Sequence, residues 1–214
     1  MQSIALIDYG SGNLRSAEKA LLKVSEGLAG ARRVAVTADP DIVAAADTIV
    51  LPGVGAFAAC MAAVDAKPGL TAALDVAVRR RGVPYLGICV GMQLMATRGL
   101  EFGATPGLDW IGGEVRRIEP AGHAFKVPHM GWNGLLDLAD HPLFAGLGED
   151  TPVYFTHSFA FFPERKEGVI AVVDHGGRFP AAVAQDNMAG VQFHPEKSQG
   201  AGLRLLANFL EWRP

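Results

Sequence analysis

The chain contains the run Tyr85-Leu86-Gly87-Ile88-Cys89-Val90-Gly91, in which a cysteine stands between two glycines. The apolar residues before Cys89 predict a short buried strand, and the apolar residues from Val90 predict a helix. A strand, a tight glycine-framed turn and a helix are typical of a nucleophile elbow, here with cysteine in place of serine. Such a turn strains its central residue and leaves no room for side chains beside it. The run therefore predicts a reactive thiol at the carboxyl end of a strand, the edge where open α/β sheets bind ligands.

Strand-like and helix-like segments alternate in the first half of the chain. We expect strands at residues 3–8, 33–37 and 48–51, the last of them stopped by Pro52-Gly53. We expect helices after residue 13, at 56–64 and at 70–80, the first of which places Leu14, Ala17, Leu21 and Val24 on one face. Near-continuous apolar strands separated by helices favour a parallel sheet that is covered on both faces.

The second half of the chain has a different pattern. Short strand-like runs at 111–118, 153–155, 169–173, 181–185 and 190–193 are separated by turn residues, which indicates antiparallel or mixed strands. A final helix is expected at about 200–212. We therefore predict a single α/β domain over residues 1–214, with an open, mostly parallel central sheet flanked by helices and additional antiparallel strands in the second half.

Composition narrows the class of protein. In 214 residues, 50% are hydrophobic and 19% charged, which excludes a disordered chain, and the net charge of -3 gives no electrostatic footprint for nucleic acid or membrane. The first apolar run meets Asp8 with no basic segment before it, and no run reaches the roughly 18 apolar residues of a membrane span. We expect a cytoplasmic protein whose two cysteines are free thiols.

A base for the thiol is expected at His194-Pro195-Glu196, directly after the apolar run 190–193. A thiol nucleophile needs a base, and the base needs a third group that fixes its tautomer. In extended backbone, His194 and Glu196 point to the same side because they are two residues apart, and Pro195 stiffens the link. We therefore expect Glu196 to accept from one ring nitrogen while the other faces Cys89.

The remaining cysteine and histidines have plainer interpretations. Cys60 lies in an apolar stretch without a polar residue, which favours a buried structural thiol. Five histidines lack a carboxylate in the same spacing, so we interpret them as surface, packing or partner-facing residues: His123, His129, His141, His157 and His175. His157 is the least ordinary of these because it ends a strand-like run. No HxxxH or CxxC pattern occurs, and we expect no metal and no cofactor.

Acyl transfer through a thioester builds negative charge on the carbonyl oxygen, which two N–H donors would stabilise. The N–H of Val90, directly after the nucleophile, is the expected first donor. The glycine-rich turn Pro52-Gly53-Val54-Gly55 is a candidate for the second, although an ordinary turn between strand and helix explains this segment equally well. Gln93 lies one helical turn after Cys89, where it could hydrogen-bond a polar substrate.

These segments together resemble the class I (triad) glutamine amidotransferases, and within them the glutaminase subunits of imidazole glycerol phosphate synthase. The likeness covers nearly the whole chain, in the expected order, in five segments: Ile7–Leu14 (IDYGSGNL), Leu51–Phe57 (LPGVGAF), Gly87–Gln93 (GICVGMQ), Pro128–Asn133 (PHMGWN) and Gln192–Ser198 (QFHPEKS). The segments around Cys89 and His194 are specific to the class, and the other pieces narrow it to the subunit. The chain departs from the expected pattern at Val90 and Phe159, where leucine and tyrosine are usual.

The resemblance implies a fold of the flavodoxin-like type and roles for individual residues. Cys89, activated by His194 and Glu196, would attack the amide carbon of glutamine to form a glutamyl thioester, which water then hydrolyses. Backbone at Val54 and Val90 would stabilise the oxyanions. Further residues would complete the glutamine pocket: Gly55, Gln93, His157, Ser158 and Phe159.

The resemblance also implies a partner. Ammonia would pass to a cyclase subunit with a (β/α)8-barrel fold, which forms imidazole glycerol phosphate and aminoimidazole carboxamide ribotide in histidine biosynthesis. The residues expected on the partner-facing side are Asn13, Met130, Trp132 and Lys197. We expect low activity without the partner, because free ammonia would be wasted, and the flexible turn at Gly53-Val54-Gly55 is our candidate for the element that the partner biases.

Three alternatives remain open at this point. The chain could be a glutaminase that feeds another synthase, such as that of pyridoxal phosphate, although the LPGVG and HPEKS segments argue against this. It could be a cysteine hydrolase of peptides or esters that uses the same triad. It could also be a binding module on an inactive hydrolase fold, against which the intact Cys89, His194 and Glu196 argue.

Overall fold

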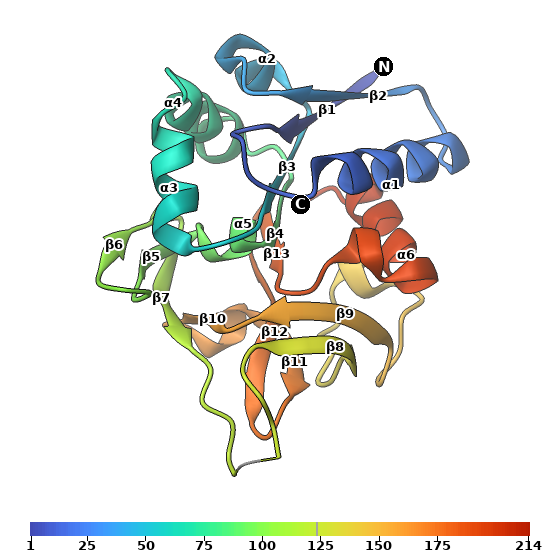
Figure 1. Ribbon diagram of the computed structural model, residues 1–214. Helices are drawn as coiled ribbons and strands as arrows, with labels where there is room; N and C mark the ends of the chain where they lie inside the picture. The colour runs from blue at the N-terminus through green and yellow to red at the C-terminus, as the bar shows by residue number, and fades with distance from the viewer. Residues whose placement is uncertain (123) are drawn as a thin grey trace.

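The computed structural model describes residues 1–122 and 124–214, and its centre is a seven-stranded sheet (Figure 1). His123, which we interpreted as a surface or packing residue, lies outside the described residues. The strand order is β11-β12-β13-β4-β3-β1-β2. The bounds are β1 (Gln2–Ile7), β2 (Arg32–Thr37), β3 (Thr48–Gly53), β4 (Tyr85–Cys89), β11 (Val169–Asp174), β12 (Arg178–Gln185) and β13 (Met188–Val191).

The pairing within the sheet confirms the predicted fold class. The strands from β2 to β13 run parallel to their neighbours, whereas β12 and β11 are added in antiparallel fashion. Because β1, β3 and β4 are parallel neighbours, their carboxyl ends lie at the same edge of the sheet. In an open α/β sheet that edge binds ligands.

Helices cover both faces of the sheet (Figure 1). On one face lie α1 (Leu14–Gly27) and α6 (Gln199–Glu211), and α3 (Phe57–Asp65) and α4 (Leu70–Asp75) lie on the other, with α2 (Pro40–Ala45) packed against α4. The side of α1 that faces the core buries Ala17, Leu21 and Val24, as its spacing predicted. In the described part of the chain, no helix is long and apolar enough to cross a membrane.

Two smaller sheets complete the second half. The first has the order β10-β7-β5-β6, with bounds β5 (Ala96–Gly99), β6 (Thr105–Pro106), β7 (Ile111–Arg117) and β10 (Phe159–Pro163). The second pairs β8 (His129–Gly134) with β9 (Pro152–His157). The strands β5, β6 and β8 were not predicted because they are short or rich in glycine and polar residues, and β10 was not predicted although its residues are apolar. Single-turn 3-10 helices occupy Pro142–Phe144, Lys166–Gly168 and Pro195–Lys197.

Two expected boundaries were wrong, and one predicted helix is short. The strand β3 is not stopped by Pro52-Gly53 but runs through them, since Gly53 still pairs with Cys89 of β4. The helix expected at 70–80 changes after Asp75 into a π-helical turn, Val76–Arg80. The helix that begins at Val90, α5 (Val90–Gln93), is only one turn long because the chain then enters β5.

Candidate functional site

The backbone around Cys89 has the geometry of an elbow. Cys89 ends β4 with φ 54° and ψ -112°, a region that residues with a side chain rarely adopt. A Cβ atom on Gly87 would lie 2.5 Å from the carbonyl oxygen of Gly91, and one on Gly91 would lie 1.8 Å from that of Leu51. Both glycines are therefore required by close backbone approach, and the strain at Cys89 is held in place by the packing of β3, β4 and α5.

His194 and Glu196 lie side by side. Nδ1 of His194 donates to Oε1 of Glu196 at 2.9 Å, and both side chains are almost fully buried. The extended link that we expected is wrong: residues 195–197 form a 3-10 turn, closed by the N–H of Lys197 on the carbonyl of His194 at 3.0 Å. The turn still returns the carboxylate to the ring, and Asn13 Nδ2 approaches the same oxygen at 3.5 Å.

The second nitrogen of His194, Nε2, differs from Nδ1 in its surroundings. Nε2 is buried and has no hydrogen-bond partner among the described residues. Burial lowers the pKa of an imidazole, but Cys89 and Glu196 outweigh that effect and raise the pKa of His194 from 6.5 to about 9. The ring therefore carries its proton at neutral pH. A cationic imidazole beside a cysteine favours the thiolate, which is the nucleophilic form.

A cavity of about 290 Å³ opens above Cys89 and His194. All of the residues expected for the oxyanion hole and the substrate line it: Val54, Gly55, Val90, Gln93, His157, Ser158 and Phe159. Glu196 lies behind His194 and does not reach the cavity. The cavity can therefore hold a small amide beside a sulfur atom, with polar groups on several sides.

The side-chain nitrogen of Gln93 already makes hydrogen bonds within the protein. Its Nε2 donates to the carbonyl of Phe159 and to Oε1 of Gln192, both at 3.0 Å. Both N–H bonds are used, so only Oε1 of Gln93 remains for a ligand, and it can only accept. The hydroxyl that a tyrosine would carry at position 159 is absent, but the backbone of Phe159 retains this structural contact.

The turn after β3 is held on the side away from Cys89. The N–H of Val54 donates to Ser11 Oγ at 3.4 Å, and the carbonyl of Val54 accepts from Ser11 Oγ at 2.7 Å and from Cys60 Sγ at 3.3 Å. Because β3 lies between β4 and β1, an N–H aimed at Ser11 is turned toward β1. Cys60 is buried as expected, and besides the Val54 carbonyl its sulfur lies 3.6 Å from Oγ of Ser11, in a distant segment.

Two of the other histidines form a buried pair. Nδ1 of His129 and Nε2 of His157 are 3.1 Å apart, and Nδ1 of His157 lies 2.9 Å from the carbonyl of Phe159. Burial lowers the pKa of His129 to about 3 and that of His157 to about 4, so both are neutral at pH 7. His141 and His175 are half-buried. In residues 1–122 and 124–214, no three His, Cys, Asp or Glu side chains are placed to hold a metal ion.

Two residues of the site were not predicted. Glu101 lines the cavity, and its Oε2 accepts from the N–H of Phe57 at 2.8 Å. Gln192 is fully buried, and its Nε2 lies 3.7 Å from Cys89 Sγ. A polar residue within the apolar run 190–193 was a signal that could have identified Gln192. The loop that carries Glu101 offered no such signal.

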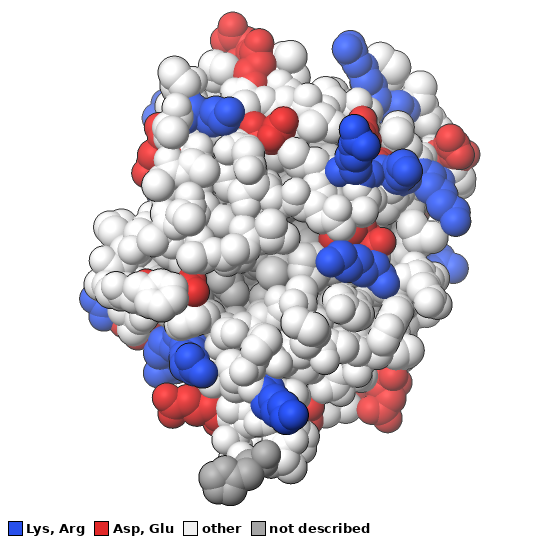
Figure 2. Space-filling view, viewed as in Figure 1, with Lys and Arg blue, Asp and Glu red and all other residues white. Residues whose placement is uncertain are grey.

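The expected partner-facing residues lie beside the site. Met130 and Trp132 on β8 are 64% and 49% exposed, so Trp132 is not a core residue. The ring of Tyr154 lies between Trp132, at 6.0 Å, and the Lys197 ammonium, at 5.6 Å. The middle of the face in Figure 2 carries few charged side chains. Exposed aromatic and methionine side chains of this kind are enriched at protein interfaces.

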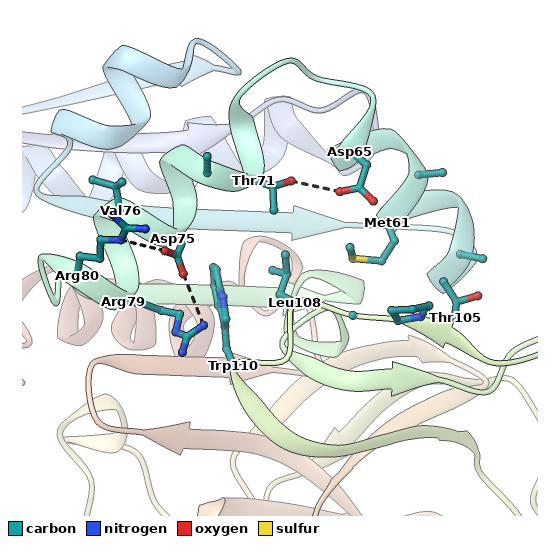
Figure 3. Close-up of a pocket in the computed structure, with 15 residues that line it drawn as sticks. Met61, Asp65, Thr71, Asp75, Val76, Arg79, Arg80, Thr105, Leu108 and Trp110 are labelled. Atoms are coloured by element: carbon teal, nitrogen blue, oxygen red, sulfur yellow. Dashed lines mark hydrogen bonds and ion pairs between the residues drawn. The ribbon is translucent and has the colours of Figure 1, made fainter.

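A larger hollow, of about 960 Å³, lies elsewhere, between α3, α4 and the segment around Trp110 (Figure 3). Its polar groups are paired with one another, since Thr71 donates to Asp65 and Asp75 pairs with Arg79 and Arg80. None of the predicted site residues lines it. The predicted oxyanion and substrate residues line the smaller cavity at Cys89 instead.

Comparisons with known proteins bear on the family of this chain. Residues 5–212 match the family described as glutamine amidotransferase class-I. The chain is 60% identical to the imidazole glycerol phosphate synthase subunit HisH of Caulobacter vibrioides over 100% of both chains, and 53% identical to that of Ruegeria pomeroyi over 98% and 99%. Among solved structures, a glutamine amidotransferase is 19% identical with a TM-score of 0.70 over 97% of both chains. Another, from Thermotoga maritima, is 15% identical with a TM-score of 0.58 over 91% and 76%.

Proposed function

This chain belongs to the class-I glutamine amidotransferase family, and we infer from that premise that it is the glutaminase subunit of an imidazole glycerol phosphate synthase. It hydrolyses glutamine to glutamate and ammonia for histidine biosynthesis. The observation that carries the inference is the full-length match to HisH subunits. We propose further that residues 1–214 act as one domain in the cytoplasm, in keeping with a biosynthetic subunit.

The reaction follows from the geometry at Cys89. The thiolate attacks the amide carbon of glutamine, and the carbonyl oxygen becomes an oxyanion in reach of backbone N–H groups. The proton on His194 passes to the leaving nitrogen, ammonia departs, and a glutamyl thioester remains. Water then loses a proton to His194 and attacks the thioester, which releases glutamate and restores Cys89. Glu196 keeps Nδ1 protonated, so that Nε2 is always the nitrogen that exchanges the proton.

Glutamine binding needs a partner for its α-ammonium group, and we propose Glu101. Its carboxylate lines the cavity while its Oε2 is held by the N–H of Phe57. Gln93 Oε1 supplies a further acceptor. The backbones of Gly55, Ser158 and Phe159, with the side chain of His157, would enclose the rest of the substrate.

We expect Glu101→Gln to raise KM for glutamine about 10- to 100-fold, because a charge-assisted hydrogen bond of about 1.5–3 kcal/mol is lost. The amide oxygen can still accept from Phe57, so the fold should be unaffected. Steady-state kinetics in the presence of the partner measure the change. The matched control is Glu211→Gln at the exposed end of α6, which should leave KM unchanged. An unaltered KM in Glu101→Gln would remove Glu101 from the substrate site.

The raised pKa of His194 predicts how the glutaminase activity falls at alkaline pH. Since that pKa is raised to about 9, the imidazole is protonated at pH 7–8 and loses its proton as the pH rises through 9. A neutral ring cannot protonate the leaving nitrogen, so kcat/KM, which reports the free enzyme, should fall about tenfold per pH unit above this value. Measuring glutamate release against pH tests this. Glu196→Gln should move the fall to lower pH, and a parent profile that already falls near 6.5 would contradict the prediction.

The turn at Gly53-Val54-Gly55 is our candidate for control by the partner. With the N–H of Val54 directed at Ser11, only Val90 is ready to bind an oxyanion, and the turn would have to rotate to supply the second donor. A partner that favours the rotated turn would raise kcat. Equal glutaminase rates with and without the ligand-bound cyclase would refute this coupling.

Ser11→Ala should raise the glutaminase rate of the isolated chain about fivefold, because a hydrogen bond worth about 1 kcal/mol no longer holds the resting turn. The rate in the complex should change little, since the partner already selects the rotated form. Ser16→Ala on α1 is the control. A partner-free rate that stays constant or falls in Ser11→Ala would show that Ser11 does not restrain the turn.

The partner is proposed to be a (β/α)8-barrel cyclase that binds at Asn13, Met130, Trp132 and Lys197 and receives ammonia from the cavity. A histidine auxotroph that lacks its own glutaminase subunit tests the function. Expression of this chain should restore growth without histidine, provided that the host cyclase accepts it or its own cyclase is supplied. Restored growth on a pyridoxal auxotroph instead would favour the other synthase.

A further inference from the structure

Gln192 occupies a buried position beside the nucleophile that the mechanism above does not use. It directly follows β13, whose Val191 pairs with Ile88 of β4, so Gln192 is brought level with Cys89. Its backbone N–H donates to the carbonyl of Ala181 at 2.8 Å. Its side chain is wholly buried, where an amide must be hydrogen-bonded to be tolerated.

The orientation of this amide is determined by its neighbours. The carbonyl of Phe159 can only accept, so Gln93 must direct its nitrogen to it. The other N–H of that nitrogen points to Gln192, which must therefore present its oxygen, at 3.0 Å. The nitrogen of Gln192 is then left facing Cys89 Sγ at 3.7 Å. His157 Nδ1 also approaches the Phe159 carbonyl, at 2.9 Å.

We propose that Gln192 is a catalytic residue, which donates an N–H to the sulfur of Cys89 and stabilises the thiolate. This inference rests on the proposed function, in which Cys89 is the nucleophile. A hydrogen bond to an anion is about twice as strong as one to a neutral group, and more so where water is excluded. The sulfur thus has a donor on one side and the His194 imidazolium as its acid–base partner. No atom is transferred to or from Gln192.

The reactivity of the Cys89 thiol distinguishes a Gln192 that stabilises the thiolate from a Gln192 that only packs against the sulfur. Alkylation by iodoacetamide requires the thiolate, so its rate against pH reports how strongly the protein stabilises that form. The full-length chain is used without glutamine and without partner. Labelling at Cys89 is quantified by mass spectrometry of the peptide, which separates it from Cys60; both thiols are buried, but Cys89 lines the cavity.

Gln192→Glu keeps an oxygen for Gln93 but replaces the N–H with a carboxylate beside the sulfur. The pH of half-maximal alkylation should rise by about one unit or more, and the rate at a pH below both midpoints should fall about tenfold. Gln192→Met, which removes the donor without adding charge, should show a smaller rise in the same direction. Gln185→Glu on β12, the same substitution away from the site, should leave the profile unchanged.

The alkylation profiles of the Gln192 variants decide whether Gln192 acts as a donor to the sulfur. An unchanged profile in Gln192→Met, with a melting temperature near that of the parent, would overturn the proposal even if Gln192→Glu shifts, because the added charge alone disfavours the thiolate. If Gln192→Glu does not fold, Gln192→Met decides alone. If neither folds, Gln192→Asn, whose amide is one methylene short of the sulfur, takes their place. The alkylation assay involves no glutamine or cyclase, so it tests the donor role of Gln192 separately from the proposed function. If the profiles shift but the histidine auxotroph is not complemented, the proposed function is wrong and the donor role stands.

Discussion

Replacing Cys89 by Ala is expected to abolish glutamine turnover, by about 10⁴-fold or more, because no other group can form the covalent intermediate. The alanine fits, since it keeps Cβ and removes only the sulfur. The strain at φ 54° remains but needs no change of backbone. Glutamate release by the complex with its cyclase is the measurement, and a rate within tenfold of the parent would refute the role of Cys89.

The same variant carries its own control. If the cyclase can use ammonia from solution, the complex with Cys89→Ala should still form imidazole glycerol phosphate when an ammonium salt is supplied at alkaline pH. Retained ammonia-dependent synthesis with lost glutamine-dependent synthesis shows that the chain folds and docks. Loss of both would indicate a failure of folding or assembly, which thermal melting of the isolated chain distinguishes.

The parts of the site that could be predicted are local in the chain. The elbow at Cys89 depends on glycines two residues to either side, and the His194–Glu196 pair depends on a spacing of two. Both features could be predicted because the reactive residues and the backbone that positions them lie within one short segment of the sequence. Even there the 3-10 turn at residues 195–197 was missed, because a rigid Pro195 is compatible with extended backbone and with the first position of a turn.

The parts that could not be predicted depend on contacts between distant segments. Gln192 reaches Cys89 only because β13 lies beside β4, and Ser11 reaches Val54 only because β1 lies beside β3. Glu101 faces the cavity because its loop packs on the start of α3 at Phe57. The strand order decides these contacts, and no property of the individual residues reveals it. The type of sheet could be predicted from the sequence, but which strands lie side by side in it could not.

Replacing Gly91 by Ala is expected to prevent stable folding, although alanine is the residue that helices favour most. The new Cβ would lie 1.8 Å from the carbonyl oxygen and 2.8 Å from the carbonyl carbon of Leu51, and both are backbone atoms of β3. Relief would require β3 to separate from α5, which would disturb the ladder that pairs Leu51 with Gly87. We expect a loss of more than about 4 kcal/mol, within the range seen for severe core disruption, and little soluble protein.

The matched control for Gly91→Ala is Gly200→Ala. Gly200 lies in the first turn of α6, where an added Cβ meets nothing within 4 Å. There the substitution should be neutral or stabilising by about 0.5–1 kcal/mol, because it lowers the entropy of the unfolded chain. Soluble yield and thermal melting by circular dichroism compare the two variants. If Gly91→Ala melts within a few degrees of the parent, α5 is not packed against β3 as described, and the backbone restraint on Cys89 must come from elsewhere.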